Sequence, residues 1–462
     1  MLSDELRQQL RDCQQEHVLA WWDVLTEAER CHLVQQLSGI DLQQLRRLHD
    51  SRDCCVRIPA AEHIQPVPII GLGASHRDAW ERGADALRQG RVAVLVVAGG
   101  QGNRLGFHHP KGMFPIGPVT GRTLFQIHAE KVLALRRWSG RPIPFLIMTS
   151  HATETETRQF FEDRKYFGLP PDEVWFFRQS AMPALEISSG KLLLETLGAI
   201  HTCPNGHGGA LSGLAESGLL ARLRQQGIRL VFYCHVDNPL VKIADPAFLG
   251  NHLVADAEVS SKCVAKHEPL EKLGHLVTVE GRCTVLEYSE LSEDLLRRRD
   301  EQGRLWLGTG NPAIHIFSVS FLERVIQAAV QLPFHAARKK VPHLDGAGRL
   351  VNPEQENALK FETFIFDLLP LAERWTVVEA DRREEFAPLK NATGADSPQA
   401  VAQAQSNLAA DWLNQAGIAV PRDPSGNAAV PIEISPLFAL NAEELLRKVD
   451  RDIRVETALY LG

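Results

Sequence analysis

The stretch that decides the fold is Arg91-Val-Ala-Val-Leu-Val-Val-Ala98, followed by Gly99-Gly-Gln-Gly-Asn-Arg-Leu-Gly106 and then by Pro110-Lys-Gly112. Its apolar part is short, rich in β-branched residues and without polar alternation, which is typical of a parallel strand covered on both faces. The glycines that follow let the backbone approach a ligand closely and turn its N–H groups toward an anion. Arg104 and Lys111 add positive charge to the same turn. The stretch therefore predicts a buried strand leading into a phosphate-binding loop that contains Gly99, Gly100, Gly102 and Asn103.

Two common glycine motifs do not fit this loop. A dinucleotide-binding loop starting at Gly100 and Gly102 would need a third glycine where the chain has Leu105, and an acidic residue about 20 residues further on. Glu130 lies too far along the chain for that role. A P-loop needs Gly-Lys-Ser/Thr, but Lys111 follows a proline and precedes a glycine. A nicotinamide-dependent oxidoreductase, one alternative on such a sheet, is therefore disfavoured.

Length and composition exclude several classes of protein. A chain of 462 residues is too long for one typical compact core and predicts two or three domains around one large one. A formal net charge of -7 argues against general nucleic-acid binding, because phosphate backbones need a basic surface. No apolar run approaches the roughly 18 residues of a membrane span, and the N-terminus lacks the pattern of a secretory signal. We expect a cytoplasmic protein with neither nucleic-acid nor membrane partners.

The cysteines show no Cys-x-x-Cys spacing, so the sequence predicts no zinc site. We expect them to be reduced and mostly buried, as small hydrophobic residues are. They are Cys13, Cys31, Cys54, Cys55, Cys203, Cys234, Cys263 and Cys283.

Composition divides the chain into three segments. Residues 1–66 have helical spacing of leucines and almost no glycine, which predicts a helical N-terminal region, and prolines and glycines up to residue 73 mark a linker. Residues 67–394 form the expected main domain. Residues 395–462 are rich in Gln, Ala, Asn and Pro and predict a small C-terminal domain with a short helix at 443–448.

Apolar strand-like runs alternate with helix-like stretches through the main domain. Such alternation predicts an α/β fold, a largely parallel sheet with helices on both faces. In sheets of this kind ligands bind outside the carboxyl ends of the strands. The runs are 92–98, 145–149, 174–177, 230–236, 259–264 and 314–317.

The glycine loop resembles the signature loop of the UDP-sugar pyrophosphorylase family, and most of all that of eukaryotic-type UDP-N-acetylglucosamine pyrophosphorylases. The likeness recurs in order along nearly the whole chain. The matching motifs are Thr123-Leu-Phe-Gln-Ile127, Met182-Pro-Ala184, Gly206-His-Gly-Gly209, Val236-Asp-Asn238, Val241-Lys-Ile-Ala-Asp-Pro246, Glu287-Tyr-Ser-Glu290, Leu332-Pro-Phe-His335 and Phe386-Ala-Pro-Leu-Lys-Asn391. The resemblance implies a Rossmann-like nucleotide-diphospho-sugar transferase fold of the GT-A-like kind, with a mixed sheet flanked by helices. It also implies uridylyl transfer, in which a sugar 1-phosphate attacks the α-phosphate of UTP and pyrophosphate leaves, with Mg²⁺ as the cofactor.

Uridylyl transfer is an in-line displacement at phosphorus, so the protein mainly has to position two anions and neutralise their charge. Lys111 is the first catalytic candidate, because from the loop it reaches the triphosphate, and Arg104 would orient the phosphates that leave. Lys390 matches the family's second lysine and would meet the sugar phosphate. From the local sequence, Asp237 fits a magnesium ligand and a residue capping the turn before Pro239 equally well. The resemblance favours the magnesium role.

The resemblance also assigns residues to the uracil and the sugar. Gln179 matches the position that contacts uracil, and its amide can both donate and accept as uracil requires. Backbone groups around Gly99 and Gly206 would flank the base. Hydroxyl-rich sugars require short polar side chains and a close backbone. The residues expected at the sugar are Gly274, Glu287 and Asn311.

Three positions depart from the family pattern. His207 stands in the Gly206-His-Gly-Gly209 turn, where the family usually has an asparagine that lies against the sugar. Gly308 stands where an asparagine is often found near the same pocket, and Asn103 replaces a usual threonine in the phosphate loop. Two changes at one pocket predict a broadened or shifted sugar preference.

The preferred function is formation of a UDP-sugar from UTP and a sugar 1-phosphate, with N-acetylglucosamine 1-phosphate as the first candidate. A UDP-glucose, UDP-galactose or broad-specificity pyrophosphorylase is the alternative within the family. A non-catalytic nucleotide-sugar sensor is the alternative from another class, although the presence of Lys111, Asp237 and Lys390 speaks against it. We expect a monomer or a weak homo-oligomer.

Overall fold

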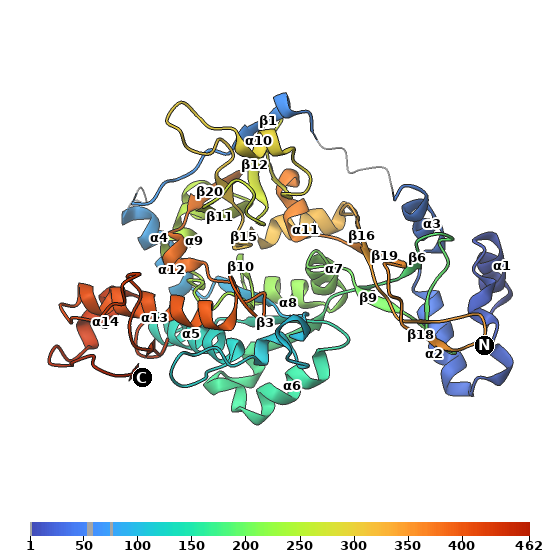
Figure 1. Ribbon diagram of the computed structural model, residues 1–462, viewed down its shortest axis with the longest axis horizontal. Helices are drawn as coiled ribbons and strands as arrows, with labels where there is room; N and C mark the ends of the chain where they lie inside the picture. The colour runs from blue at the N-terminus through green and yellow to red at the C-terminus, as the bar shows by residue number, and fades with distance from the viewer. Residues whose placement is uncertain (1, 53–58, 74–76) are drawn as a thin grey trace. The chain divides into compact units, whose positions relative to one another are not determined.

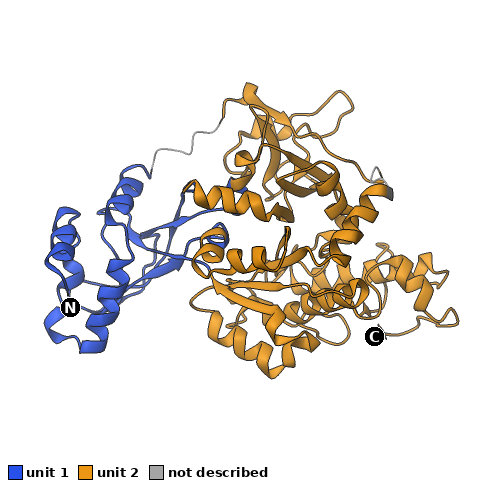
Figure 2. Cartoon of the chain, turned by 180° about the vertical axis from the view of Figure 1, so that it is seen from behind, with its two compact units in different colours: residues 1–58, 179–210, 331–367 blue, residues 59–178, 211–330, 368–462 orange. Residues whose placement is uncertain are grey.

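The structure is a computed structural model that describes residues 2–52, 59–73 and 77–462 (Figure 1). Packing divides the chain into two compact units, drawn in different colours in Figure 2. Unit 1 comprises residues 1–58, 179–210 and 331–367, and unit 2 comprises residues 59–178, 211–330 and 368–462. Each unit is therefore assembled from stretches that lie far apart in the chain.

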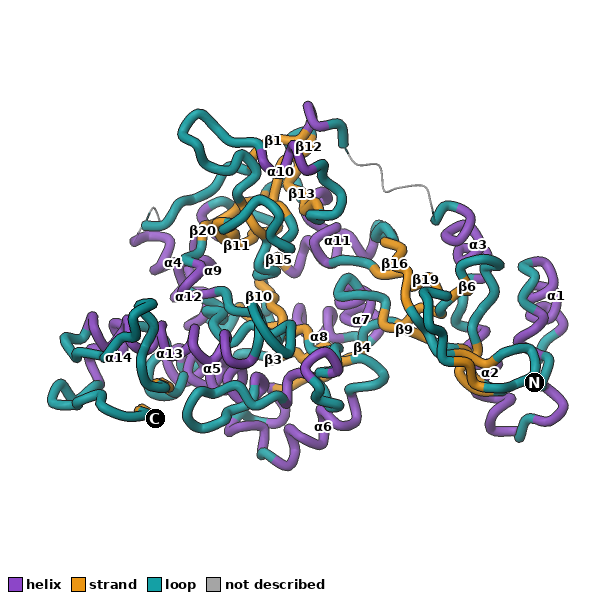
Figure 3. Tube along the Cα trace, in the orientation of Figure 1, coloured by secondary structure: helices purple, strands orange, loops and turns teal. Residues whose placement is uncertain are grey.

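Unit 2 is built on a large mixed sheet. The strand order is β1-β12-β14-β11-β15-β10-β2-β3-β4, with β13 beside β12 and β20 beside β11. Figures 1 and 3 show β3, β10, β15 and β11 following one another across unit 2. The strands are β1 (Ile64–Pro66), β2 (Val92–Val97), β3 (Phe145–Thr149), β4 (Val174–Arg178), β10 (Leu230–His235), β11 (Val259–Ala265), β12 (His275–Val279), β13 (Arg282–Leu286), β14 (Thr309–Gly310), β15 (His315–Ser318) and β20 (Trp375–Glu379).

The parallel part of this sheet is the predicted one. β2 pairs in parallel with β3 and with β10, and β3 pairs in parallel with β4. Residues 92–96 are each at most 1% exposed, because the strand is covered on both faces. The predicted Rossmann-like mixed α/β fold is confirmed. β15 lies antiparallel between β10 and β11, which makes the sheet mixed rather than largely parallel.

Helices of unit 2 pack their apolar residues on this sheet. One hydrophobic cluster joins Val94 and Phe232 of the sheet to Leu87 of α4, Phe125 of α5 and Phe248 of α9. The helices of unit 2 are α4 (Arg77–Arg88), α5 (Leu124–Ser139), α6 (Glu154–Asp163), α8 (Leu219–Gln225), α9 (Pro246–Val254), α10 (Glu293–Arg297), α11 (Val319–Gln327), α12 (Arg382–Glu385), α13 (Pro398–Gln415) and α14 (Ala442–Lys448), and α7 (Gly209–Glu216) leads from unit 1 into unit 2.

Unit 1 combines the N-terminal helices with two later stretches. Leu10, Leu33 and Leu45 of the helices share a hydrophobic cluster with Leu185 and Phe361. The helices are α1 (Asp4–Asp12), α2 (Glu27–Ser38) and α3 (Leu42–Asp50). The strands are β5 (Ala181–Pro183), β6 (Leu185–Glu186), β7 (Leu194–Thr196), β8 (Ala199–Ile200), β9 (Thr202–Pro204), β16 (His335–Lys339), β17 (His343–Leu344), β18 (Leu350–Val351) and β19 (Ala358–Glu362).

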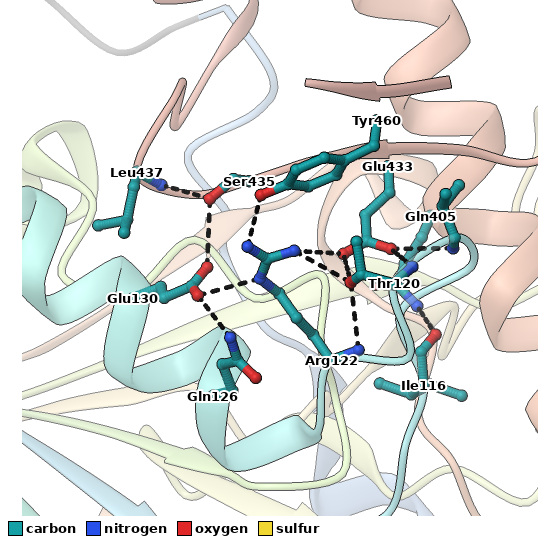
Figure 4. A network of polar contacts seen from close by, with 11 residues as sticks. Ile116, Thr120, Arg122, Gln126, Glu130, Gln405, Glu433, Ser435, Leu437 and Tyr460 are labelled. Carbon is teal, nitrogen blue, oxygen red and sulfur yellow. Dashed lines mark hydrogen bonds and ion pairs between the residues drawn. The ribbon is translucent and has the colours of Figure 1, made fainter. Parts of the chain in front are cut away.

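The C-terminal residues have a hydrophobic cluster of their own, which includes Leu413, Leu445 and Leu461. The last strands, β21 (Ile432–Ile434) and β22 (Leu459–Leu461), pair in parallel. Figure 4 shows how a polar network ties them to the rest of unit 2: Arg122 donates to Glu130 at 3.0 Å, to Glu433 at 3.1 Å and to the hydroxyl of Tyr460. This network fixes the C-terminal residues on the loop before α5.

The end of the segment predicted as helical instead forms β1, which pairs with β12. Ile70, in the predicted linker, bridges Val378 of β20. The two compact units do not have a boundary near residue 394. The predicted division into three segments, 1–66, 67–394 and 395–462, therefore stays a prediction.

Among the described cysteines, Cys31 is exposed and the rest are buried, and all are free. Cys54 and Cys55 lie outside the described residues. Within the described parts of the chain, no helix is both long enough and apolar enough to cross a membrane.

Candidate active site

The glycine loop leaves β2 and folds back on itself. Lys111 N donates to Gly100 O at 3.0 Å, and Gly102 N donates to His109 O at 2.9 Å. These bonds close the loop, so Lys111 returns to the level of the strand end. Asn103 and Arg104 are exposed on the loop, and the Asn103 amide donates to the Gln101 side chain at 2.9 Å.

Close packing fixes the position of Lys111. A side chain at Gly112 would lie 2.3 Å from ring atoms of Phe125 on α5, so only glycine fits. Lys111 Nζ lies 3.4 Å from Leu389 O and 3.5 Å from Asp237 Oδ2. The lysine is therefore held between the loop, β10 and the residues just before Lys390.

Asp237 follows β10 at the same edge of the sheet as the glycine loop. β10 runs parallel to β2, and Val236 N donates to Val97 O at 3.0 Å, so both strands end side by side. Burial alone would raise the pKa of Asp237, but Lys111, His235 and Lys390 more than offset it, and the pKa lies below its usual value. Asp237 therefore remains a carboxylate in a positively charged setting.

Lys390 comes to the same place from the far part of the chain. Leu389 N donates to Asp237 O at 2.8 Å, which joins the backbone before Lys390 to the end of β10. Lys390 N donates to Asp396 O at 2.8 Å, and Lys390 Nζ lies 5.8 Å from the centre of the Phe386 ring. The predicted catalytic lysines and Asp237 are thus brought together.

The residues predicted at the sugar lie beside one another in unit 2. Asn311 N donates to Gly274 O at 2.8 Å, and the Asn311 side chain accepts from Ala313 N at 3.0 Å. A side chain at Gly274 would come within 3.2 Å of Glu287 Oε1. Gly274, Glu287 and Asn311 therefore form one polar cluster with a closely approaching backbone.

Gln179, Gly206 and His207 belong to unit 1. Gly206 has φ of +83°, and a side chain there would lie 2.4 Å from Thr363 O, so the turn requires glycine. His207 Nδ1 accepts from Ile365 N at 3.1 Å, and its ring stacks on Phe364 with centres 5.2 Å apart. His207 is thus an ordered residue of the turn.

Among Lys111, Asp237 and Lys390, the carboxylate of Asp237 is the group that could bind a magnesium ion. Within the described residues no group of three His, Cys, Asp or Glu side chains could hold a metal. Mg²⁺ usually binds one or two carboxylates together with substrate phosphates and water, not an all-protein cage. The arrangement therefore fits a metal that arrives with a triphosphate.

The buried lysines that bond to the segments carrying Asp237 and Lys390 were not identified from the sequence. Lys131 of α5 donates to Pro239 O and to Val241 O at 2.8 Å, just after Asp237. Burial lowers the pKa of Lys131 to about 8. Its place four residues after the buried Ile127, on the apolar stripe of the helix, was a usable signal. Lys262 of β11 is a single lysine within the strand-like run 259–264, and this pattern gave no such signal.

Three comparisons bear on this site. A family model described as UTP–glucose-1-phosphate uridylyltransferase matches residues 54–409. The chain is 35% identical over 477 residues to UDP-N-acetylhexosamine pyrophosphorylase-like protein 1 of Xenopus tropicalis, covering 96% of this chain and 93% of that protein. It is 35% identical over 407 residues to UDP-N-acetylglucosamine pyrophosphorylase of Saccharomyces cerevisiae, covering 86% of this chain and 84% of that protein. The solved structure of uridine diphosphate N-acetylglucosamine pyrophosphorylase from Trypanosoma brucei in complex with inhibitor matches with a TM-score of 0.82 at 27% identity, covering 98% of this chain and 97% of that one.

Proposed function

The chain belongs to the UTP–glucose-1-phosphate uridylyltransferase family and is a nucleotidyltransferase, and we propose that it makes UDP-N-acetylglucosamine and pyrophosphate from UTP and N-acetylglucosamine 1-phosphate. The observation that carries the proposal is the placement of Lys111, Asp237 and Lys390 together beside the glycine loop. Two relatives are named for N-acetylglucosamine or N-acetylhexosamine, which supports the choice of sugar.

The proposed reaction needs no nucleophilic side chain. The sugar phosphate supplies the attacking oxygen, so the protein has to align two anions and stabilise the charge that develops at phosphorus. Lys111 and Arg104 bind the phosphates of UTP from the glycine loop, and Lys390 binds the sugar phosphate. Mg²⁺ held by Asp237 and the phosphates would neutralise charge on the triphosphate.

The remaining predicted residues serve recognition in this proposal. Gln179 pairs with uracil, and the resemblance assigns backbone groups near Gly206 of unit 1 and near Gly99 of unit 2 to the same base. The resemblance assigns Gly274, Glu287 and Asn311 of unit 2 and the turn residue His207 of unit 1 to the sugar. The buried, free cysteines support a reducing compartment, for which we propose the cytosol.

Pyrophosphate release from UTP and Mg²⁺ tests the function. The substrates to compare are the 1-phosphates of N-acetylglucosamine, N-acetylgalactosamine, glucose and galactose, each assayed alone. A clear preference for the N-acetyl sugars supports the proposal. Turnover with none of them, while UTP still binds, would favour the nucleotide-sugar sensor.

A second candidate keeps the reaction and changes the sugar. His207 and Gly308 both depart from the usual asparagine in the region expected to meet the sugar. If the assay favours glucose or galactose 1-phosphate, these two departures are the first explanation to test.

A further inference from the structure

Lys262 is a buried lysine in the middle of β11. Its side chain is 2% exposed, and its Nζ lies 2.6 Å from both carboxylate oxygens of Glu385 and 3.1 Å from Asp245 Oδ2. Burial acts to lower the pKa of Lys262, but Glu385 and Asp245 more than offset it, and the pKa lies above its usual value. The lysine therefore stays charged.

A buried ion cluster of this kind is poor evidence for stability, because removing the charges from water costs about as much as their attraction returns. Its better attested use is to fix one arrangement of the chain over others. The relevant question is which parts of the chain Lys262 holds together.

The two carboxylates come from the two segments that carry the proposed site. Asp245 ends the loop that begins at Asp237, and its side chain caps α9 by accepting from Ala247 N at 3.1 Å. Glu385 ends α12, five residues before Lys390, and is 4% exposed. Lys262 thus contacts the far end of the Asp237 loop and the start of the Lys390 segment.

Asn238 joins the same two segments nearer the site. Its amide donates to Glu385 O at 2.7 Å, and its Oδ1 accepts from Ala387 N at 3.1 Å. Leu389 N then donates to Asp237 O at 2.8 Å. A continuous set of bonds therefore runs from Lys262 through Glu385 and Asn238 to the backbone of Asp237.

We propose that Lys262 is a positioning residue of uridylyl transfer, which sets the spacing between Asp237 and Lys390 by holding Asp245 and Glu385. The inference rests on the proposed function, because it is the roles of Asp237 and Lys390 that give their spacing a meaning. In-line transfer depends on that spacing, since a displacement of about 1 Å at the reacting groups costs on the order of 100-fold in rate.

The test uses the double variant Lys262→Met/Glu385→Gln. Lys262→Met alone would leave two carboxylates without their cation and could fail to fold, whereas the double variant removes one charge of each sign. Asp245 remains 23% exposed and keeps its bond from Ala247 N. The matched control is Lys242→Met, because Lys242 and Glu384 join the same two segments but are 32% and 38% exposed.

The double variant is expected to lose about 100-fold in kcat, with its KM for UTP little changed. Lys242→Met is expected to retain its kcat, since exposed ion pairs contribute little. Thermal melting of both variants checks that they are folded at the assay temperature. A folded double variant with the kcat of the wild type would overturn the proposal and leave Lys262 a purely structural role.

Amide hydrogen exchange gives a readout that does not require turnover. In the double variant the amides of Ala387 and Leu389 should exchange faster than in the wild type, and in Lys242→Met they should not. Unchanged exchange at both amides would also overturn the proposal. Absence of turnover in the wild type, by contrast, refutes the proposed function, and exchange then decides separately whether Lys262 holds the two segments.

Discussion

Lys111 Nζ lies 3.5 Å from Asp237 Oδ2, although 126 positions separate the two residues in the chain. The Asp237 side chain is 14% exposed and that of Lys111 is 21% exposed, so water screens the pair only in part. The lysine proposed to bind phosphate and the carboxylate proposed to bind a metal are thus neighbours in the protein itself. Asp237 is expected to depend on Lys111 for its charge, and each of the two for its position on the other.

Lys111→Ala should lower kcat about 100-fold or more, a loss of roughly 3 kcal/mol of transition-state stabilisation. The reason is that, in the proposed reaction, the lysine stabilises the charge that develops as pyrophosphate leaves. Steady-state kinetics of pyrophosphate release measure kcat and KM separately. If KM for UTP rises while kcat stays unchanged, Lys111 only binds the substrate and this role is wrong.

The parallel part of the sheet could be predicted because its signal is local. The run 145–149 coincides with β3, and the run 230–236 ends one residue beyond β10. Continuous apolar residues bounded by turn residues are sufficient for a strand buried on both faces. The antiparallel β15 has the same kind of sequence, so its direction could not be read from composition.

The assembly of unit 1 could not be predicted, because its contacts are remote in sequence. The Gln15 side chain donates to Gly190 O at 3.0 Å and accepts from Leu192 N at 2.8 Å, 175 and 177 positions away. Gln36 makes the same pair of contacts with Ile200, 164 positions away. A glutamine just before a helical turn, or within a helix, gives no sign of such partners in the sequence.

The candidate site was predictable to the extent that motifs carry it. The glycine loop has a physical signal of its own, whereas Lys390 could be found only by resemblance. The partners of Lys262 could not be found, because a single lysine in an apolar run gives no indication of which carboxylates will reach it. Only the three-dimensional structure shows that Lys262 is buried and which carboxylates surround it.

His207→Asn should raise the ratio of kcat/KM for N-acetylglucosamine 1-phosphate to that for glucose 1-phosphate about tenfold, as expected for one gained polar contact of about 1.4 kcal/mol. His207 Nδ1 accepts from Ile365 N, so the neutral ring carries its proton on Nε2. Asparagine is shorter and restores the amide that the family usually has in this turn.

The matched control for this change is Asn103→Thr, another departure from the family pattern, but on the phosphate loop. It should leave the ratio between the two sugars unchanged. Parallel kcat/KM measurements on both variants decide the matter. An unaltered ratio in His207→Asn would make the histidine a silent replacement.

Stability should fall steeply as the pH drops from about 6.5 towards 4. Burial lowers the pKa of His128, His252 and His275 to about 4 and that of His315 to about 3. The unfolded chain, with ordinary histidine pKa values of about 6.5, then binds more protons than the folded one. The stability that depends on keeping these rings neutral is full above pH 6.5 and is lost as the pH falls.

Each of these four histidines contributes a slope of at most about 1.4 kcal/mol per pH unit. Urea unfolding at a series of pH values measures the total slope. In His252→Gln, which removes the ring between Ser260 Oγ at 2.7 Å and Ser318 Oγ at 3.0 Å, the slope should shrink by about a quarter at most. An equally steep slope in that variant would show that His252 is not one of the groups that titrate.

Glu433→Gln should cost about 3 kcal/mol of stability, because it breaks a buried, charge-assisted cluster. The Glu433 carboxylate is buried and accepts from Val119 N at 2.9 Å, from Thr120 N at 2.7 Å and from Arg122 at 3.1 Å (Figure 4). Glutamine has nearly the same shape but turns one acceptor into a donor, which leaves buried donors without a partner. Turnover by the folded variant should persist, because Lys111 is held by Gly100 and by the packing of its neighbour against Phe125.

The matched control for this last prediction is Glu443→Gln on α14. Glu443 is 83% exposed and pairs with Arg447 along the helix, so its loss should change the free energy of unfolding by no more than about 0.5 kcal/mol. Urea unfolding of both variants, followed by tryptophan fluorescence, gives the two values under one condition. Equal stabilities would mean that the carboxylate of Glu433 is not what fastens the C-terminal strands to the loop before α5.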